Sequence, residues 1–568
     1  MDFYFSCCYE HISNLKVEYC SDLNKQECAH NIIYIEKKKH LDYLSRDING
    51  SRILKVGDVL TSGNFRIKLD DQDGMHYSII ISPDLKSIRI KADWLNLLPI
   101  YYYINGTMIY VSSSYSKMIS LINNYKVDSL FYPELVLLYF PMNGRTYYDC
   151  IKRLQFGSEI NISSDGFFIR NNHRFFNMFS SEPVKFKKAL QYSTNLYIET
   201  VKKYFHDGNA ISLTGGFDGR ANVACAHYYN VKYSTYSYGR IGFSDVDIPL
   251  MISAKLPVDY SLIELDDKYL KTDYLQCVLE YLLNSSGQNG FSYPQTLYSI
   301  KTISEYSKVI ITGFIGSELL RSCREPDPEV LSFCVRDALL GISHTNNYAY
   351  NISNVMTKMG LLEDINLIDD VLDELEYYLK ELPKELTINQ KYTVLMYEYI
   401  ISYVFGPWIY NGMKYSKIRN PFIDHDFFDY VAKTEVSGFY EKFLEQNMIK
   451  RRNKLMIYGR IMNKTWPALG KLPMSKGYSP SEVLYPFGLG VLVGKYLRSR
   501  KKEAYGLDKL NTISGAKKYI NEMNQNLIMN QSIDIDIVKS MLDKDAYCRD
   551  IAFWALSKIT YKMIQNTK

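Results

Sequence analysis

The stretch NAISLTGGFDGRANVACA, residues 209–226, decides how the second half of the chain is expected to fold. Its first five residues form a short apolar run that predicts a buried strand, and its Ala-rich end predicts a helix. Gly215 and Gly216 stand between the two, with Asp218 and Arg220 after them. Backbone N–H groups gather at such a helix N-terminus and favour an anion there. Because the stretch is neither GxxxxGK[ST] nor GxGxxG, a simple tight turn explains it equally well on its own.

Strands and helices alternate around this stretch. Helical spacing is seen across 182–205 and 246–256, with a further helix beginning at 316, and the β-prone runs are 209–213, 232–238 and 308–314. Strand–helix alternation predicts a parallel sheet with crossover helices, in which the glycine turn lies at the carboxyl end of a strand. Beyond residue 330 the pattern is almost entirely that of amphipathic helices.

The first part of the chain has a different pattern. Short β-prone runs separated by turn residues occupy 65–71, 77–83, 87–93, 101–114 and 166–172. The sequence INGT at 104–107 predicts a hairpin turn. We therefore expect an α/β protein of two domains: an α+β domain at 1–185, and a domain at 186–568 with a parallel sheet and a large helical extension.

Composition narrows the function classes. The 568 residues carry a net charge of +5 and 46% hydrophobic residues, which implies neither nucleic acid nor membrane as a partner. The N-terminus lacks the pattern of a signal peptide. Ten scattered cysteines without a CxxC pair predict a cytoplasmic protein with reduced thiols. The basic cluster KYLRSRKKEAYG at 495–506 is interpreted as a solvated face, with a contact to a peptide or to nucleotide phosphates as the alternative.

LTGGFDGR resembles the SGGxDS pyrophosphate loop of the asparagine synthetase family, which adenylates a carboxylate and then forms an amide. Four further segments resemble that family's motifs in the same order: 236–256, 309–321, 418–432 and 472–480. In the first half, 90–121 and 144–160 resemble its class II glutaminase domain. The resemblance implies an antiparallel glutaminase-like sandwich followed by an adenine-nucleotide α-hydrolase-like domain.

The resemblance also implies ATP and Mg²⁺ as ligands and assigns roles to residues. Asp218 becomes a Mg²⁺ ligand, and Lys476 in LPMSKGYSP becomes the catalytic cation that a glycine turn of this kind does not itself carry. Arg220 either pairs with a phosphate or is a solvated helix residue, and Asp424 is interpreted as structural. The nucleotide is expected to contact Ser212, Leu213, Thr214, Gly215, Gly216, Asp218, Gly219, Tyr238, Gly239, Thr312 and Gly313.

Two departures from the family's pattern change the expected chemistry. The glutaminase nucleophile is a cysteine, whereas this chain has Asp2, so glutamine hydrolysis is not expected and the amine comes from elsewhere. In the segment GFIGSE, an ungapped match places Ser317 at the family's second Mg²⁺ aspartate. A shift of one residue places Glu318 there, which we favour because two carboxylates facing ATP make better electrostatic sense. Phe314 stands where relatives carry a polar group, so no general base is named.

The expected function is an ATP-dependent, AMP-forming amide ligase acting on a small-molecule or peptide carboxylate. β-Lactam synthetases and lasso-peptide cyclases, which the arrangement resembles, take the amine from the substrate itself. The lasso-type version implies a precursor peptide and its processing protease as partners. The alternatives are amidation of a sugar uronic acid and a catalytically retired scaffold or binding protein.

Overall fold

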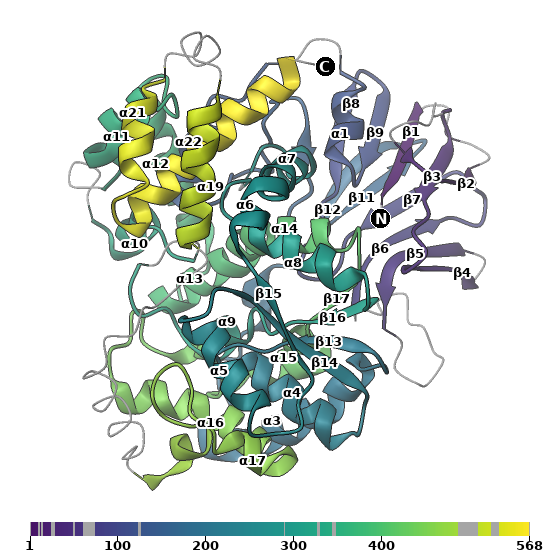
Figure 1. The fold of residues 1–568 in the computed structure, drawn as a ribbon. Coiled ribbons are helices and arrows are strands. Elements are labelled where there is room, and N and C mark those ends of the chain that lie inside the picture. Colours follow the sequence, from purple (N-terminus) through teal and green to yellow (C-terminus); the bar gives the residue numbers. More distant parts are fainter. Residues whose placement is uncertain are drawn as a thin grey trace.

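The structure is a computed structural model that describes the chain in segments. These are residues 2–8, 12, 15–23, 29–48, 51–60, 74–122, 126–288, 290–326, 330–342, 348–486, 509–523 and 533–566. The predicted strand at 65–71 and the basic cluster at 495–506 lie outside these residues. The described chain is a mixed α/β structure with two largely antiparallel sheets and one parallel sheet (Figure 1).

The first half forms two six-stranded sheets. One has the order β10-β8-β9-β1-β3-β2 and consists of β1 (Phe3–Cys8), β2 (Lys16–Cys20), β3 (Ile32–Glu36), β8 (Tyr101–Asn105), β9 (Met108–Ser112) and β10 (Lys152–Arg153). The other has the order β12-β11-β7-β6-β5-β4 and consists of β4 (Asp42–Ile48), β5 (Ser51–Val59), β6 (Gly74–Ile81), β7 (Ile88–Lys91), β11 (Ser158–Ser163) and β12 (Gly166–Asn171). The rings of Phe3 and Tyr77 lie 5.1 Å apart, so the inner faces of the sheets meet.

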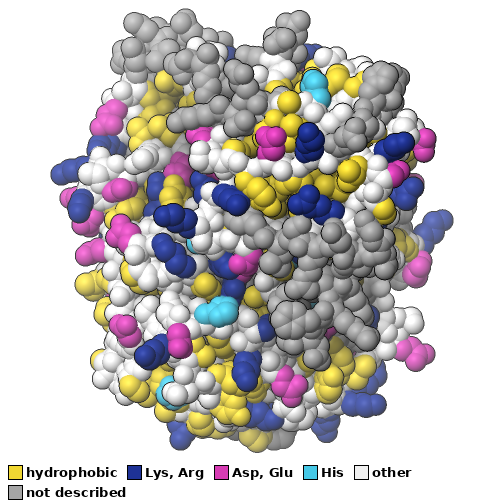
Figure 2. Space-filling model, turned by 90° about the vertical axis from the view of Figure 1, so that its right-hand side faces the viewer, with side chains coloured by type: hydrophobic (Ala, Val, Ile, Leu, Met, Phe, Trp, Pro, Cys, Tyr) yellow, Lys and Arg dark blue, Asp and Glu magenta, His cyan; other side chains and the backbone are white. Residues whose placement is uncertain are grey.

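These two sheets confirm most of the strands predicted for the first half, and they differ from a purely antiparallel arrangement at one strand pair. β8 and β9 pair as the hairpin predicted at INGT, with Asn105 opposite Met108. Every strand pair is antiparallel except β2 and β3, which are parallel. The outer surface on this side of the molecule shows basic and acidic side chains interspersed, as the modest net charge leads one to expect (Figure 2).

The second half contains a five-stranded, fully parallel sheet with the order β15-β14-β13-β16-β17. Its strands are β13 (Asn209–Ser212), β14 (Tyr233–Gly239), β15 (Tyr260–Glu264), β16 (Val309–Ile311) and β17 (Lys417–Arg419). The chain leaves β13 through α4 (Asp218–Tyr228) to β14, and through α5 (Ser244–Ser253) to β15. It returns on the other side of β13 as β16, so the strand order reverses at β13. A crevice forms at such a switch point, and the glycine turn opens onto it.

Helices make up most of the remaining described chain, as the pattern beyond residue 330 predicted. Met396–Phe405 is a π-helix, η6, a type common at functional sites. None of the helices in the described segments is long and apolar enough to cross a membrane. The other helices are α1 (Tyr115–Ile119), α2 (Phe131–Leu138), α3 (Phe186–Val201), α6 (Asp267–Thr272), α7 (Tyr274–Asn284), α8 (Pro294–Ser304), α9 (Gly316–Leu320), α10 (Phe333–Leu340), α11 (Tyr348–Lys358), α12 (Asn366–Glu381), α13 (Ile388–Leu395), α14 (Gly406–Gly412), α15 (His425–Ala432), α16 (Met448–Thr465), α17 (Pro467–Gly470), α19 (Lys509–Glu522), α21 (Ile535–Met541) and α22 (Ala546–Asn566).

The two halves meet through buried charges. Strand β17 packs on β5 and β6. Arg419 on β17 donates from Nε and Nη2 to the two carboxylate oxygens of Asp58 on β5, at 2.6 and 2.8 Å. Asp58 is 1% exposed and Arg419 4%. Such a two-pronged pair fixes the relative orientation of its two partners. The predicted domain boundary near residue 185 stays a prediction, because contacts between the two halves do not show where one domain ends and the next begins.

Asp2, at the position where the resemblance would place a cysteine nucleophile, is part of the same interface. Its buried carboxylate accepts hydrogen bonds from Tyr410 on α14 and from Ser113, and Lys414 lies 3.9 Å away. Burial alone would raise the pKa of Asp2, but the amino terminus, Lys414 and the two hydroxyl donors outweigh it and lower the pKa. Asp2 is therefore a buried anion that links the halves.

Replacing Asp58 with Asn is expected to destabilise the protein by about 3–5 kcal/mol, because it leaves the buried Arg419 guanidinium without its counter-charge. Urea unfolding followed by circular dichroism would measure the change. Asp429→Asn is the matched control, since the ion pair of Asp429 with Lys433 is largely exposed and should contribute less than about 1 kcal/mol. Equal effects of the two substitutions would contradict the assignment of Asp58 to the interface.

Candidate functional site

A cavity of about 390 Å³ lies at the carboxyl ends of β13, β14 and β16. Helix α8 contributes to its wall, and so do η6 and α14, which follow one another in the chain. Its described lining consists of Ser212, Thr214, Gly216, Asp218, Gly219, Tyr236, Tyr238, Tyr293, Gln295, Thr296, Ser299, Ile300, Thr312, Gly313, Phe314, Phe405 and Trp408. The crevice expected at the switch point is thus a real cavity.

The structure brings most of the predicted nucleotide residues together around this cavity. Those that line it are Ser212, Thr214, Gly216, Asp218, Gly219, Tyr238, Thr312 and Gly313. Three predicted residues do not line it. Leu213 is fully buried, and its N–H donates to the carbonyl of Tyr236, so its side chain belongs to the core. Gly215 and Gly239 are also outside the lining, and Gly215 contacts another loop instead.

Gly215 and Gly219 are required by close contacts, whereas a Cβ on Gly216 would meet only Oγ1 of Thr214, at 3.4 Å. A Cβ on Gly219 would collide with the carbonyl oxygen of Ser212, and one on Gly215 would lie 2.8 Å from Cβ of Ser475. Two of the turn's N–H groups already have acceptors in the described structure. Gly215 donates to Oδ1 of Asp245 at 3.0 Å, and Gly216 donates to Oγ1 of Thr214 at 3.2 Å. An anion entering the turn would therefore compete with the Asp245 carboxylate for the N–H of Gly215.

The loop that carries Lys476 lies directly on the glycine turn. The N–H of Ser475 donates to the carbonyl of Gly215 at 3.2 Å. Lys476 is the next residue, so its Cα is about 3.8 Å from that of Ser475. Its side chain is exposed and is not among the described residues that line the cavity.

Arg220 holds this loop in place, which corrects both interpretations made from the sequence. It is fully buried, so it is neither a solvated helix residue nor a phosphate partner. Its Nη1 and Nη2 donate to the carbonyls of Leu472 and Pro473 at 2.9 and 2.6 Å. Burial lowers the pKa of Arg220 to about 9. Because Arg220 also follows the glycine turn, one side chain fixes the lysine loop to the N-terminal turn of α4.

Asp218 faces the segment GFIGSE. Its carboxylate accepts hydrogen bonds from Tyr458 on α16 and, at 3.5 Å, from Ser317. Ser317 in turn accepts a hydrogen bond from Arg321 at 2.6 Å. Burial raises the pKa of Asp218, and Tyr458, Arg321 and Ser317 oppose the shift.

The two alignments of GFIGSE have different counterparts in the structure. Ser317 is the residue that touches Asp218, as the ungapped match places it. Glu318 begins beside it in α9, and its pKa is raised to about 7, first by burial and then by the charge of Asp218. Ser317 thus contacts Asp218 directly, whereas Glu318 interacts with it through charge and is not among the described residues that line the cavity.

The same segment has an unusual backbone. Ile315 has φ +68°, a left-handed conformation that β-branched residues rarely adopt. Gly313 and Gly316 approach Asp218 so closely that a Cβ on either would collide with its side chain. Strain of this kind is maintained only where the surroundings enforce it, and it clusters at functional sites. The strained turn lies against the acid that the sequence singled out.

The residues present suit a hard divalent cation in part. Burial raises the pKa of both Asp218 and Glu318, and the charge of Asp218 raises that of Glu318 further, so a nearby cation would stabilise both carboxylates. No group of three or more His, Cys, Asp or Glu suited to a metal occurs among the described residues. Two carboxylates suffice for Mg²⁺ only when phosphate oxygens complete its shell. The carboxylates present would therefore hold Mg²⁺ only together with a ligand that carries phosphate.

Sequence reasoning missed several contributors. Tyr458 is one of 51 tyrosines, and nothing in its helix marks it as the partner of Asp218. Asn222 is buried in α4 and donates to the carbonyl of Thr312 at 3.0 Å, which ties the glycine-turn helix to the end of β16. Asp245 was placed only within a segment resembling the family. Of these residues, only Asn222 carried a signal in the sequence, because it is a polar residue inside the Ala-rich run of α4.

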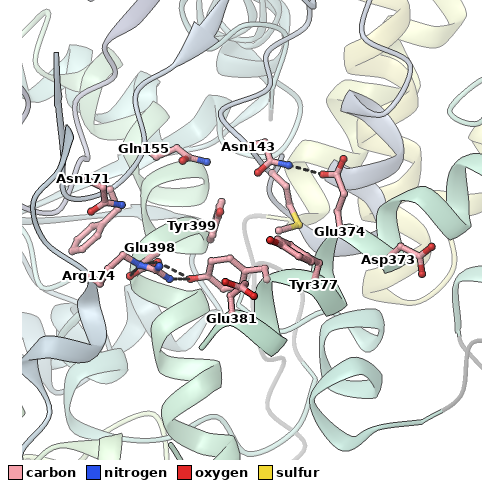
Figure 3. A pocket seen from close by; sticks show the side chains of 13 residues that line it. Asn143, Gln155, Asn171, Arg174, Asp373, Glu374, Tyr377, Glu381, Glu398 and Tyr399 are labelled. Carbon is pink, nitrogen blue, oxygen red and sulfur yellow. Dashed lines mark hydrogen bonds and ion pairs between the residues drawn. The ribbon is translucent and has the colours of Figure 1, made fainter. Parts of the chain in front are cut away.

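A second cavity, of about 570 Å³, has an entirely different lining, where residues 142–174 of the first half meet α12 and η6 (Figure 3). Arg174 pairs with Glu398 at 3.0 Å, and Asn143 donates to Glu374 at 2.8 Å. These groups already have partners. None of the predicted site residues lines it, so the smaller cavity is the candidate site.

No protein-family model matches the chain, and no curated protein matches it. The resemblance to the asparagine synthetase family therefore rests on the sequence motifs alone and stays a prediction.

Replacing Arg220 with Leu is expected to release the lysine loop, because the carbonyls of Leu472 and Pro473 lose two charge-assisted hydrogen bonds. Hydrogen exchange of residues 472–478 should quicken by at least about tenfold in the variant. Arg460→Leu is the control, since Arg460 donates only to an exposed side chain, that of Gln191. Unchanged exchange in the Arg220 variant would show that other contacts hold the loop.

Replacing Asp245 with Asn is expected to tighten the binding of inorganic pyrophosphate with Mg²⁺. The substitution removes a negative charge beside the glycine turn, an effect on the order of 1 kcal/mol or about fivefold in Kd. Isothermal titration calorimetry would measure it. Asp247→Asn, in the same first turn of α5, is the control because Asp247 accepts from Gly242 instead. Weaker binding in the Asp245 variant would mean that Asp245 organises the turn.

Proposed function

We propose that the protein is an ATP-dependent, AMP-forming ligase that joins a substrate carboxylate to an amine. The observation that carries the proposal is the docking of two distant loops at the switch point of the parallel sheet. Ser475, next to Lys476, hydrogen bonds to Gly215 of the glycine turn, and Arg220 fixes that contact. In the asparagine synthetase family, which the motifs resemble, the corresponding two segments supply the pyrophosphate loop and the catalytic lysine.

In the first step, an oxygen of the substrate carboxylate attacks the α-phosphorus of ATP. The bond from that phosphorus to the bridging oxygen breaks, and pyrophosphate leaves. The N–H groups of the glycine turn and the N-terminus of α4 favour the negative charge of the leaving group. Lys476 reaches the same region from its loop and stabilises charge as it develops.

In the second step, the amine nitrogen attacks the acyl carbon, AMP leaves with the bonding electron pair, and one proton passes from nitrogen to a base. Mg²⁺, bound with the nucleotide, would be held by Asp218 and Glu318 and would neutralise phosphate charge. Tyr458 and Ser317 keep the Asp218 carboxylate directed at this place.

The amine is proposed to belong to the substrate or to be free ammonia. The residue at the position of the family's glutaminase nucleophile is Asp2, whose carboxylate is occupied by Tyr410 and Ser113. In this proposal the first half is a glutaminase-like sandwich retained as a scaffold. Amidation of a sugar uronic acid would use the same first step and differs only in the substrate.

The proposal is tested by exchange of labelled pyrophosphate into ATP with Mg²⁺ and a panel of carboxylates. We expect exchange with at least one carboxylate. Lys476→Ala should lower the rate by roughly 10²–10³-fold while ATP binding survives, because its charge acts chiefly on the transition state. Lys471→Ala, an exposed lysine five residues earlier, is the matched control and should leave the rate unchanged.

Absence of exchange with every carboxylate, together with absence of ATP binding by calorimetry, would favour the scaffold alternative. The contact of Asp245 with the glycine turn is the observation that supports that alternative, because it fills part of the anion site with a fixed carboxylate.

A further inference from the structure

One part of the candidate cavity is lined by three aromatic side chains. Phe314 follows β16, Phe405 ends η6, and Trp408 lies in the first turn of α14. The ring centroids of Phe314 and Phe405 lie 5.8 Å apart in a stacked arrangement, and those of Phe314 and Trp408 lie 5.0 Å apart edge to face. The three rings form a single aromatic wall.

Phe314 of the aromatic wall and the two tyrosines Tyr236 and Tyr238 lie on opposite sides of the glycine turn. Tyr236 and Tyr238 come from β14, which pairs with one edge of β13. Phe314 comes from the end of β16, which pairs with the other edge. The glycine turn follows β13 and therefore lies between them. A ligand whose phosphates occupy the turn and whose base lies over β14 leaves the β16 side for its reaction partner.

The charges of the lining restrict what that partner can be. Asp218 is the only charged side chain among the described residues that line the cavity. The remainder are hydroxyl, amide, aromatic and aliphatic groups, together with glycine. A second carboxylate next to the wall would lose its water without gaining a cation among these lining residues, which is costly. An uncharged ring or branched chain would instead bury apolar surface.

We propose that the carboxylate substrate carries an uncharged, apolar group of about aromatic size next to the carboxyl carbon, and that Phe314, Phe405 and Trp408 contact that group. This substrate class rests on the proposed ligase function. It adds a specificity determinant, since the same wall disfavours short dicarboxylates.

The probes are acyl sulfamates of adenosine, stable mimics of an acyl-adenylate in which only the acyl group varies. Binding of the 3-phenylpropionyl, acetyl and succinyl forms is measured by calorimetry, with ATP and Mg²⁺ measured on the same protein. We expect the phenylpropionyl form to bind at least about tenfold more tightly than the acetyl form, because the ring is buried against the wall, and the succinyl form to bind no better than the acetyl form.

Variants locate the effect. Phe314→Ser should remove most of the phenylpropionyl advantage without changing the affinity for ATP, while Phe314→Leu should keep part of it. Phe333→Ser is the matched control, because Phe333 packs on Tyr348 and Tyr547 and is not among the lining residues.

The outcomes separate the two proposals. Succinyl binding equal to or tighter than phenylpropionyl binding would overturn the substrate class and leave the ligase proposal intact. An advantage that survives Phe314→Ser would overturn the assignment to the aromatic wall. Failure of ATP and of every sulfamate to bind would overturn the ligase function, and the substrate class with it.

Discussion

The candidate site depends on one buried cation. Arg220 has no exposed surface and donates to the backbone carbonyls of Leu472 and Pro473, residues about 250 positions away in the chain. Burying a guanidinium is costly, and two short hydrogen bonds to carbonyl oxygens offset the cost only if the loop stays in place. The loop and the first turn of α4 are thereby made into one unit. The geometry of the glycine turn and that of the lysine loop cannot vary independently.

The parallel sheet gives this unit its position. β13 is the strand at which the strand order reverses. The connections on its two sides run in opposite directions, so the turn that follows β13 opens into a crevice between them. Three segments lie around the crevice. They are the glycine turn, the strained segment around Ile315, and the junction where η6 ends and α14 begins. Asp218 is where the first two touch. Packing of glycine against its side chain leaves the carboxylate little freedom, which is the condition for holding a ligand precisely.

The first half of the chain supports the sheet from its β17 edge. Arg419 and Asp58 pair at this contact, and Asp2 is held by Tyr410 of the second half. A carboxylate in a protein interior needs partners, and Asp2 has hydroxyl donors and a nearby lysine. An acid at this position therefore has a structural explanation of its own. The same contacts give the first half of the chain a structural role at the β17 edge of the sheet, even though no catalytic activity is expected of it.

The sequence by itself predicted strands β13, β14 and β16 of the parallel sheet and strands β6, β7, β8, β9 and β12 of the first half, because hydrophobic periodicity and turn residues are local properties. It also singled out eight of the seventeen described residues that line the cavity, through the glycine turn and the ends of two other strands. It did not predict β15 or β17, which are short strands stabilised by pairing with neighbours, nor β2 to β5, β10 and β11 of the first half.

Only the tertiary structure decided which distant residues meet. The hydrogen-bond partners of Asp218 are Ser317 and Tyr458, which lie far from it in the sequence. Arg220 binds backbone carbonyls, and no pattern in the sequence indicates which carbonyls these are. The aromatic wall unites Phe314 with residues of η6 and α14, and any one of these aromatic residues on its own is an ordinary core residue. Local pattern determines which elements form, whereas the contacts that make a site depend on packing across the whole chain.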